Sequence, residues 1–320
     1  MNSAIILFVF LSCLNGNLDG FYEAKWGFYA HKTINRMAVF TLPSSMLPFY
    51  KNHIQYITEN AVNPDARRYV IKQEAPRHYI DIDHYGVDAI YSMPRSWKDA
   101  AALYSEDTLY KYGIVPWHVL TMKYRLTKAF QERNTEKILK LSAEIGHYIA
   151  DANVPLHTTE NYNGQLSGQE GIHALWESRL PELYSQKFNF FIGKARYLDH
   201  PGDAIWEAVT EAHQALDSVF SFEQTSTKSI GEHNKYSFED KNGISTKVYS
   251  RQFCQLYHQC LNGQVERRMQ KAIRLVGDFW YTCWVDAGQP DLDKLDQNTP
   301  DSPKIKPIQK GKFPTRSHDF

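Results

Sequence analysis

The chain of 320 residues is long enough for one large domain or two small ones, and no repeat or shift in composition separates two. It carries 36 basic and 36 acidic residues, so it lacks the overall positive field that would gather a polyanion. This balance argues against tight binding of duplex nucleic acid, and any nucleic-acid substrate would have to be held locally.

The first residues are typical of an exported protein. Residues 1–16 contain an apolar run of signal-peptide length that is too short, with its polar flanks, to span a bilayer. We therefore predict a signal peptide and pro-segment over residues 1–25, and export to the periplasm, the cell surface or the extracellular medium. The sequence FLSC resembles a bacterial lipoprotein processing site, which makes Cys13 a candidate for lipid attachment. Simple cleavage nearby is the alternative.

Most of the remaining chain is predicted to be helical. Apolar residues recur at helical spacing in residues 31–42, 44–62, 119–130, 135–153, 201–219 and 264–285. The alternation in residues 78–85 predicts a short extended segment, and the polar stretch 223–247 predicts a surface excursion. Residues 291–320 are punctuated by proline and poor in apolar residues, so we expect a disordered polar tail. The expected fold is all-α, a single mainly helical domain over residues 26–290 with a site between helices.

The densest group of metal-ligand residue types lies within residues 144–182. His147 and Asp151 are four residues apart, as are His173 and Glu177, a spacing that places both side chains of a pair on one face of an α-helix. His157 lies between the pairs, and a glycine-rich loop over residues 161–171 joins them. Zinc prefers imidazole and carboxylate ligands, and five exceed what one ion uses comfortably, so the pattern predicts a multinuclear site. The alternative for a single pair is a surface contact or a capped core histidine.

Three further residues of ligand type precede this stretch. His31 opens the first expected helix, Asp65 follows an Asn-Pro pair, and His78 begins the alternating segment. Taken singly, His31 is better explained as an exposed helix-start histidine, Asp65 is equally well explained as a helix cap, and His78 as part of a polar edge strand or a loop.

The cysteines do not form a thiolate metal site. Outside the expected signal peptide the chain has Cys254, Cys260 and Cys283, an odd number without a CxxC pair. A Cys254–Cys260 or longer-range disulfide and buried free thiols both remain open.

Together these motifs resemble the superfamily of zinc-dependent phospholipases C and S1/P1-type nucleases. The matching features are WGxxxH at Trp26 to His31, Asp65 followed by His78, HxxxD at His147 and Asp151, PLH at His157, HxxWE at His173 to Glu177, and the late FWYTCWVDAG. The resemblance covers residues 26–288. It implies an all-α fold of the phospholipase C/P1 nuclease type that binds three zinc ions.

The resemblance also implies a ligand set for each ion. Asp65, His78, His147 and Asp151 would surround one zinc, and His157, His173 and Glu177 would hold a second. A third would use His31, Asp151 as a bridge, and the amino nitrogen and carbonyl oxygen of Trp26, which requires proteolysis to leave Trp26 at the mature N-terminus. The glutamate at position 177 resembles the phospholipase branch, whereas the WG start resembles the nucleases.

The function expected from this pattern is that of an exported zinc-dependent phosphodiester hydrolase of the phospholipase C type, with two or three zinc ions. A zinc-bound hydroxide would attack phosphorus in line, and Asp65 would be both a ligand and the acceptor of the water's proton. The expected substrate is a phospholipid headgroup, with contact to a membrane surface and no stable protein partner. The alternatives are an S1/P1-like nuclease acting on single-stranded nucleic acid and a non-catalytic secreted zinc-binding protein.

Overall fold

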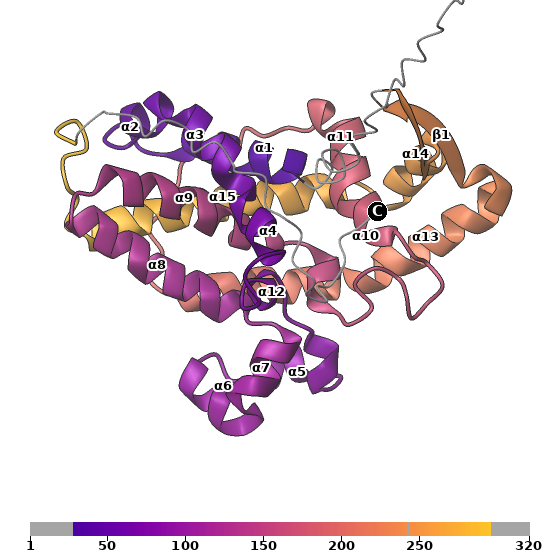
Figure 1. Ribbon diagram of the computed structural model, residues 1–320, viewed down its shortest axis with the longest axis horizontal. Coiled ribbons are helices and arrows are strands. Elements are labelled where there is room, and N and C mark those ends of the chain that lie inside the picture. Colours follow the sequence, from indigo (N-terminus) through magenta and orange to yellow (C-terminus); the bar gives the residue numbers. More distant parts are fainter. Residues whose placement is uncertain (1–27, 242, 296–320) are drawn as a thin grey trace, which may run out of the picture.

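The computed structural model describes residues 28–241 and 243–295, and nearly all regular structure in this part of the chain is helical (Figure 1). The α-helices are α1 (Phe28–Ala38), α2 (Leu47–Asn52), α3 (Ile54–Glu59), α4 (Asn63–Arg68), α5 (Ala89–Ser92), α6 (Trp97–Tyr104), α7 (Glu106–Tyr112), α8 (Val115–Gln131), α9 (Thr135–Asp151), α10 (Ile172–Ala174), α11 (Leu180–Tyr184), α12 (Pro201–Gln214), α13 (Leu216–Ile230), α14 (Arg251–Cys260) and α15 (Gln264–Asp286). The prediction of an all-α fold is confirmed. Among the described residues, every helix is too short or too polar to cross a membrane.

Helix α15 lies at the centre of the fold and packs against α1, α8, α9 and α12 (Figure 1). Its buried apolar side chains recur every three or four residues, which gives the helix a continuous apolar face. A Cβ atom on Gly277 would lie 2.0 Å from Oγ1 of Thr41, in the short 3₁₀ helix η1 (Val39–Thr41). The glycine therefore allows the chain after α1 to lie directly on α15.

A second close approach joins α1 to α9. A Cβ atom on Gly146 would lie 2.0 Å from Oδ1 of Asn35, so only glycine leaves room for this side chain. Asn35 donates a hydrogen bond from Nδ2 to the carbonyl oxygen of Ala143 at 2.9 Å, which fixes the two helices. As a result His31 of α1 stacks on His147 of α9, with ring centroids 4.1 Å apart.

The polar stretch after residue 219 differs from the sequence prediction. Helix α13 continues to Ile230, and Tyr236–Lys241 (β1) and Ile244–Tyr249 (β2) form an antiparallel hairpin in which Tyr236 pairs with Tyr249. The prediction of a surface excursion over residues 223–247 was therefore wrong for α13. The helix buries a polar residue, Glu223, whose charge is neutralised by Lys235 at 2.8 Å, and apolar spacing cannot reveal such a position.

The predicted extended segment over residues 78–85 is mostly a pair of 3₁₀ helices, η3 (Ala75–His78) and η4 (Ile82–Tyr85). The residues between them bond to two different parts of the chain. The amide of Ile80 donates to the carbonyl of His157 at 2.9 Å, and the amide of Asp81 donates to the carbonyl of Tyr112 at 2.7 Å. The segment thus holds His78 beside His157 and does not pair with a neighbouring strand.

Residues 188–200 form an irregular strap along α15, bonded to side chains spaced four residues apart on that helix. The contacting positions on α15 are Glu266, Gln270, Arg274, Asp278, Thr282 and Asp286. Asp278 accepts a hydrogen bond from the amide of Arg196 at 2.7 Å, and Thr282 accepts one from the amide of Leu198 at 3.0 Å. Five of the six side chains thus satisfy backbone groups that lack secondary-structure partners, and Asp286 accepts a hydrogen bond from the hydroxyl of Tyr197.

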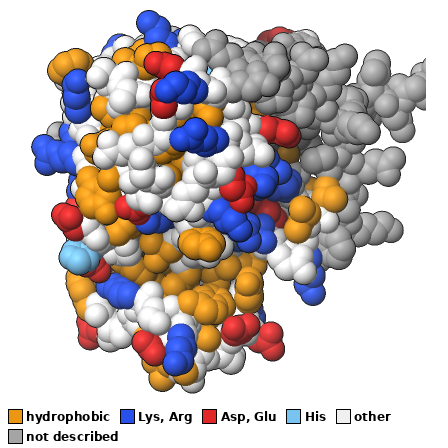
Figure 2. Space-filling model, turned by 90° about the vertical axis from the view of Figure 1, so that its left-hand side faces the viewer, with side chains coloured by type: hydrophobic (Ala, Val, Ile, Leu, Met, Phe, Trp, Pro, Cys, Tyr) orange, Lys and Arg blue, Asp and Glu red, His pale blue; other side chains and the backbone are white. Residues whose placement is uncertain are grey.

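Helices α5, α6 and α7 form a small lobe that projects from the body (Figure 1). An edge-to-face aromatic contact joins the lobe to α8, and a second one joins α8 to α12. Trp97 lies 5.7 Å from Trp117, and Trp117 lies 5.1 Å from Trp206, between ring centroids. Figure 2 shows the face of the molecule that lies on the left in Figure 1. Hydrophobic side chains gather in a hollow in the lower half of this face.

We predict that Asp278→Asn stabilises the protein in a pH-dependent way. Burial raises the pKa of Asp278 to about 6, against the opposing effects of the amide of Arg196 and the charge of Arg274. The folded state therefore holds this proton more tightly than the unfolded state, and stability falls as the pH rises from about 4 to about 6. The neutral amide does not have this pH-dependent loss of stability. The free energy of unfolding of the variant should therefore exceed that of the wild type by up to about 3 kcal/mol at pH 7, and by little at pH 4.

Thermal unfolding at pH 4, 5, 6 and 7 measures this difference. Thr282→Val is the matched control, because it removes another contact to the strap without a titrating group and should destabilise equally at each pH. An Asp278→Asn effect that does not change between pH 4 and pH 7 would contradict the prediction.

Candidate metal centre

Eight of the nine predicted ligand residues converge in space, although they are spread from residue 31 to residue 177. They are His31 in α1, Asp65 in α4, His78 in η3, His147 and Asp151 in α9, His157 in the 3₁₀ helix η5 (Pro155–Thr158), His173 in α10, and Glu177 in the π-helical turn η6 (Leu175–Arg179). All are buried except Asp65, which keeps 18% of its side chain exposed. The ninth residue, Trp26, lies outside the described residues. The eight form overlapping groups whose ligand atoms lie within 4.8 Å of one another and could hold metal ions.

The first group consists of Asp65, His78, His147 and Asp151. Oδ2 of Asp151 lies 2.9 Å from Nδ1 of His78 and 3.2 Å from Nε2 of His147. Oδ1 of Asp65 lies 3.8 Å and 3.7 Å from the same two nitrogens. Two ring nitrogens and two carboxylate oxygens therefore face one point.

The second group consists of His157, His173 and Glu177. Oε2 of Glu177 lies 2.7 Å from Nε2 of His173 and 3.4 Å from Nε2 of His157, and the two nitrogens are 3.3 Å apart. Three ligand atoms thus converge from η5, α10 and η6.

His31 lies between these two groups and contacts both. Its Nε2 is 3.5 Å from Oδ1 of Asp151 and 3.2 Å from Oε1 of Glu177. Asp151 and Glu177 therefore each direct one carboxylate oxygen to the histidines of their own group and the other oxygen to His31. The bridging position of Asp151 was expected, whereas that of Glu177 was not, because nothing in its spacing to His31 indicates a contact.

Backbone carbonyl groups orient three of the imidazole rings. Nδ1 of His147 lies 2.9 Å from the carbonyl oxygen of Ala61, and Nδ1 of His157 lies 2.5 Å from that of His78. Nδ1 of His173 lies 3.2 Å from the carbonyl oxygen of Tyr162. When Nδ1–H donates to these oxygens, the lone pair of Nε2 points into the centre, which is the usual arrangement of metal-ligating histidines. The donor set therefore fits metal ions.

The charges of the centre compensate one another. Burial acts to raise the pKa of Asp151 and Glu177, but the neighbouring histidines hold both pKa values well below their usual range. Burial acts to lower the pKa of His147, yet Asp151 and Asp65 raise it to about 8. Anionic oxygens buried this deeply need positive charge beside them, which metal cations would supply.

The local backbone around Glu177 differs from the prediction. The spacing of His173 and Glu177 predicts a regular α-helix, but α10 ends at Ala174 and Glu177 lies in the π-helical turn η6. Such turns are rare and occur often at functional sites. The wider turn still leaves the two side chains in contact and adds the contact of Glu177 with His31.

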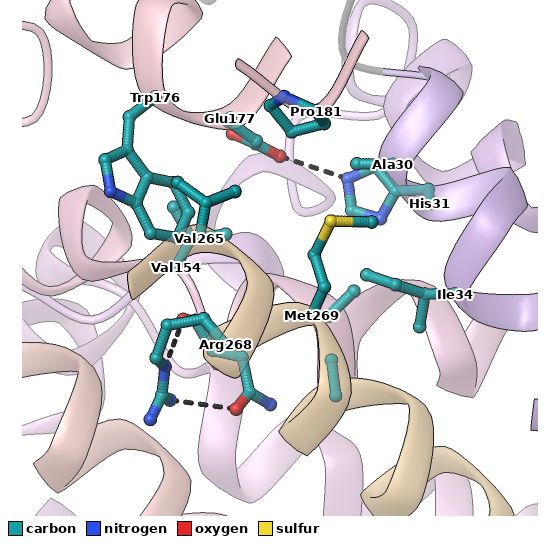
Figure 3. Close-up of a pocket in the computed structure, with 13 residues that line it drawn as sticks. Ala30, His31, Ile34, Val154, Trp176, Glu177, Pro181, Val265, Arg268 and Met269 are labelled. Atoms are coloured by element: carbon teal, nitrogen blue, oxygen red, sulfur yellow. Dashed lines mark hydrogen bonds and ion pairs between the residues drawn. The ribbon is translucent and has the colours of Figure 1, made fainter. Parts of the chain in front are cut away.

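An apolar pocket lies behind His31 and Glu177. Figure 3 shows these two side chains facing each other at one end, with Trp176, Val265 and Met269 along the walls. Arg268 lines the pocket too, but its donors are bonded to Asn153, Glu211 and the carbonyl of Ala208. The centre thus has apolar walls on this side. They lower the local dielectric constant, which strengthens the electrostatic interactions between the charged groups of the centre.

Arg68 is a charged residue beside the centre that the sequence did not single out. It is 4% exposed, and its Nη1 lies 3.8 Å from Oδ1 of Asp65. Its Nε atom is buried without a hydrogen-bond partner. The sequence feature that could have identified Arg68 is its position three residues after Asp65 in a short helix. This spacing of an acidic and a basic residue is common in helices and does not by itself indicate a functional site.

No protein-family model and no curated protein matches the chain. Among solved structures, it is similar to the alpha toxin from Clostridium absonum. The TM-score is 0.46 and the sequence identity 12%, over 86% of this chain and 67% of the toxin chain.

We predict that Zn²⁺ stabilises the protein after treatment with a chelator. Ligands from separate helices make metal binding part of the folding free energy, and a ligand at one hundred times its Kd adds about 2.7 kcal/mol. The rise in Tm should be smaller in Asp151→Asn, because Asp151 faces His31 as well as the first group.

Thermal unfolding with and without Zn²⁺ checks this, with each variant compared with its own metal-free form. Asp286→Asn, which changes a carboxylate at the far end of α15, should respond as the wild type does. Equal rises in Tm for Asp151→Asn and the wild type would show that Asp151 is not a ligand.

Proposed function

We propose that the protein is a zinc-dependent hydrolase of phosphodiester bonds, similar in its chemistry to the phospholipases C. The observation that carries this proposal is the convergence of five histidines and three carboxylates in groups linked by Asp151 and Glu177. A purely structural zinc site is closed by four ligands of its own, whereas the linked groups here would hold ions close together.

The ligand types favour zinc. Imidazole nitrogen and carboxylate oxygen suit this borderline ion, and the centre contains no thiolate. The three cysteines in the described residues are free, and Cys254 and Cys283 are buried elsewhere in the core. We propose two or three ions. The third would be held by His31, Asp151 and, once Trp26 is the mature N-terminus, the amino nitrogen and carbonyl oxygen of Trp26.

Bound zinc supplies an activated water and positive charge for the phosphoryl oxygens. The chain itself supplies orientation and proton transfer. Asp65 is the most exposed of the three carboxylates, so a substrate approaching the centre meets it first. Burial acts to raise its pKa, but His147 and Arg68 lower it, so Asp65 is ionised at neutral pH, as a ligand and a proton acceptor must be. Its proposed role is to hold the proton lost by the attacking water.

Arg68 supplies further positive charge next to Asp65. A guanidinium group binds phosphoryl oxygens through several N–H donors, and the guanidinium of Arg68 lies beside Asp65, the most exposed carboxylate of the centre. We propose that Arg68 strengthens the binding of the phosphoryl group as its charge increases in the transition state.

The substrate we favour is a phospholipid headgroup. The net charge of zero gives no attraction for long polyanions, and the proposed export would bring the protein to membrane surfaces. A single-stranded nucleic acid is the second candidate, because Tyr162 lies 6.3 Å from His173 and Tyr79 directly follows His78, and both rings are partly exposed. Residues 1–25, which carry the proposed export signal and Cys13, lie outside the described residues.

We predict that zinc-loaded protein with Trp26 as its first residue hydrolyses phosphatidylcholine faster than single-stranded DNA or RNA. Release of phosphocholine and of acid-soluble nucleotides measures the three activities side by side. Faster cleavage of the nucleic acids would replace the phospholipase proposal with the nuclease. Full zinc binding without any of the three activities would favour the non-catalytic alternative.

We predict that Arg68→Gln lowers kcat/KM by about 10- to 100-fold, which corresponds to about 1.4–2.7 kcal/mol of transition-state stabilisation. Arg68→Lys keeps the charge without the planar set of donors and should lose less. Zinc content should be unchanged in both, because Arg68 is not a ligand. Wild-type activity in Arg68→Gln would remove Arg68 from the mechanism.

A further inference from the structure

We propose that Glu74 is a positioning residue for the first metal-binding group, which it serves by fixing the ring of His78 from the side opposite the metal. This inference rests on the proposed function, because it assumes that His78 binds zinc. It concerns a residue outside the set of ligands.

The ring of His78 is oriented differently from those of three other histidines of the centre. His147, His157 and His173 each turn Nε2 toward the centre and Nδ1 toward a backbone carbonyl. His78 turns Nδ1 toward Asp151, so its Nε2 points into the protein, where it is buried without a hydrogen-bond partner. A histidine that binds metal through Nδ1 carries its proton on Nε2 and needs an acceptor there.

Glu74 provides the carboxylate on that side. Its side chain is 0% exposed, and its Oε1 lies 3.9 Å from Nε2 of His78. This distance is longer than a hydrogen bond, but it places a negative charge next to the position of the Nε2 proton. A carboxylate behind a ligating histidine fixes the tautomer and raises the basicity of the ligand nitrogen.

The carboxylate of Glu74 is itself held in place by three donors. Arg67 donates to Oε1 at 3.2 Å, and Arg77 donates to Oε2 at 2.6 Å. The hydroxyl of Tyr148 donates to Oε1. Two arginines keep the buried group ionised, and the three donors prevent it from changing rotamer.

Tyr148 extends this arrangement to the rest of the first group. It directly follows His147 in α9, and its ring packs edge-on against His78, with centroids 5.3 Å apart. The bond between Tyr148 and Glu74 therefore ties the segment that carries His78 to the helix that carries His147 and Asp151. Removing Glu74 should loosen the first group and leave His157, His173 and Glu177 in place.

The test compares Glu74→Gln with Glu144→Gln. Glu144 is the matched control, because it also binds Arg67, at 2.5 Å, and is buried in α9. Each variant removes one negative charge from Arg67, but Glu74 is the carboxylate next to His78. Zinc affinity is measured by competition with a chromophoric chelator, and histidine tautomers by long-range proton–nitrogen NMR of the zinc-loaded protein.

We expect Glu74→Gln to weaken one class of zinc site by about 10- to 100-fold, the usual effect of losing such a partner, and to leave the other class unchanged. Glu144→Gln should change affinity by less than about threefold. The wild-type spectrum should show Nε2–H for His78 and Nδ1–H for His147, His157 and His173. In Glu74→Gln the resonances of His78 should shift or broaden.

Two results would overturn the role of Glu74 without touching the proposed function: full zinc affinity at all sites in Glu74→Gln, or an equal loss in Glu144→Gln. Absence of zinc binding in the wild type would contradict both. Should Glu74→Gln fail to fold, Tyr148→Phe removes one of the three donors to Glu74 while keeping the ring. It should weaken the same class of site by a smaller factor, and unchanged affinity in that variant would count against the proposal.

Discussion

The structure depends on how three buried or half-buried carboxylates share five imidazole rings. Asp151 directs one oxygen to His78 and His147 and the other to His31, and Glu177 divides its oxygens in the same way between the second group and His31. An isolated carboxylate in such a place would lose several kcal/mol of solvation, so the charges must be balanced within the centre. Because both carboxylates bridge, the groups cannot be placed independently. A shift of any one helix would disturb all of them.

The surrounding fold meets this constraint mainly through close backbone contacts. Gly146 lets α1 approach α9, and Gly277 lets the chain after α1 lie on α15. Backbone carbonyls from η2 (Asn60–Val62), from η3 and from the glycine-rich loop orient the imidazoles. Gln169 fixes that loop to Glu223 at 2.5 Å, which links the second group to the buried Glu223–Lys235 pair. Elements that look peripheral in sequence therefore support the centre.

The sequence allowed the fold class and the convergence of eight residues to be predicted, but for two different reasons. His147 and Asp151 are four residues apart in a helix with clear apolar spacing, so their common face follows from local geometry. The grouping of His31, Asp65 and His78 with them followed from the resemblance alone, since each had an ordinary explanation. The π-helical turn at Glu177, the buried Glu223 in α13 and the roles proposed for Arg68 and Glu74 depend on contacts between distant segments. Apolar periodicity carries no information about such contacts.

The central claim is that these side chains bind metal ions in linked groups. X-ray diffraction from zinc-loaded crystals, recorded on both sides of the zinc absorption edge, tests it most directly. We expect anomalous difference peaks between His78, His147 and Asp151 and between His157, His173 and Glu177, with Asp151 and Glu177 each adjoining His31. Peaks confined to other parts of the protein, or a centre without any peak at saturating zinc, would contradict the account.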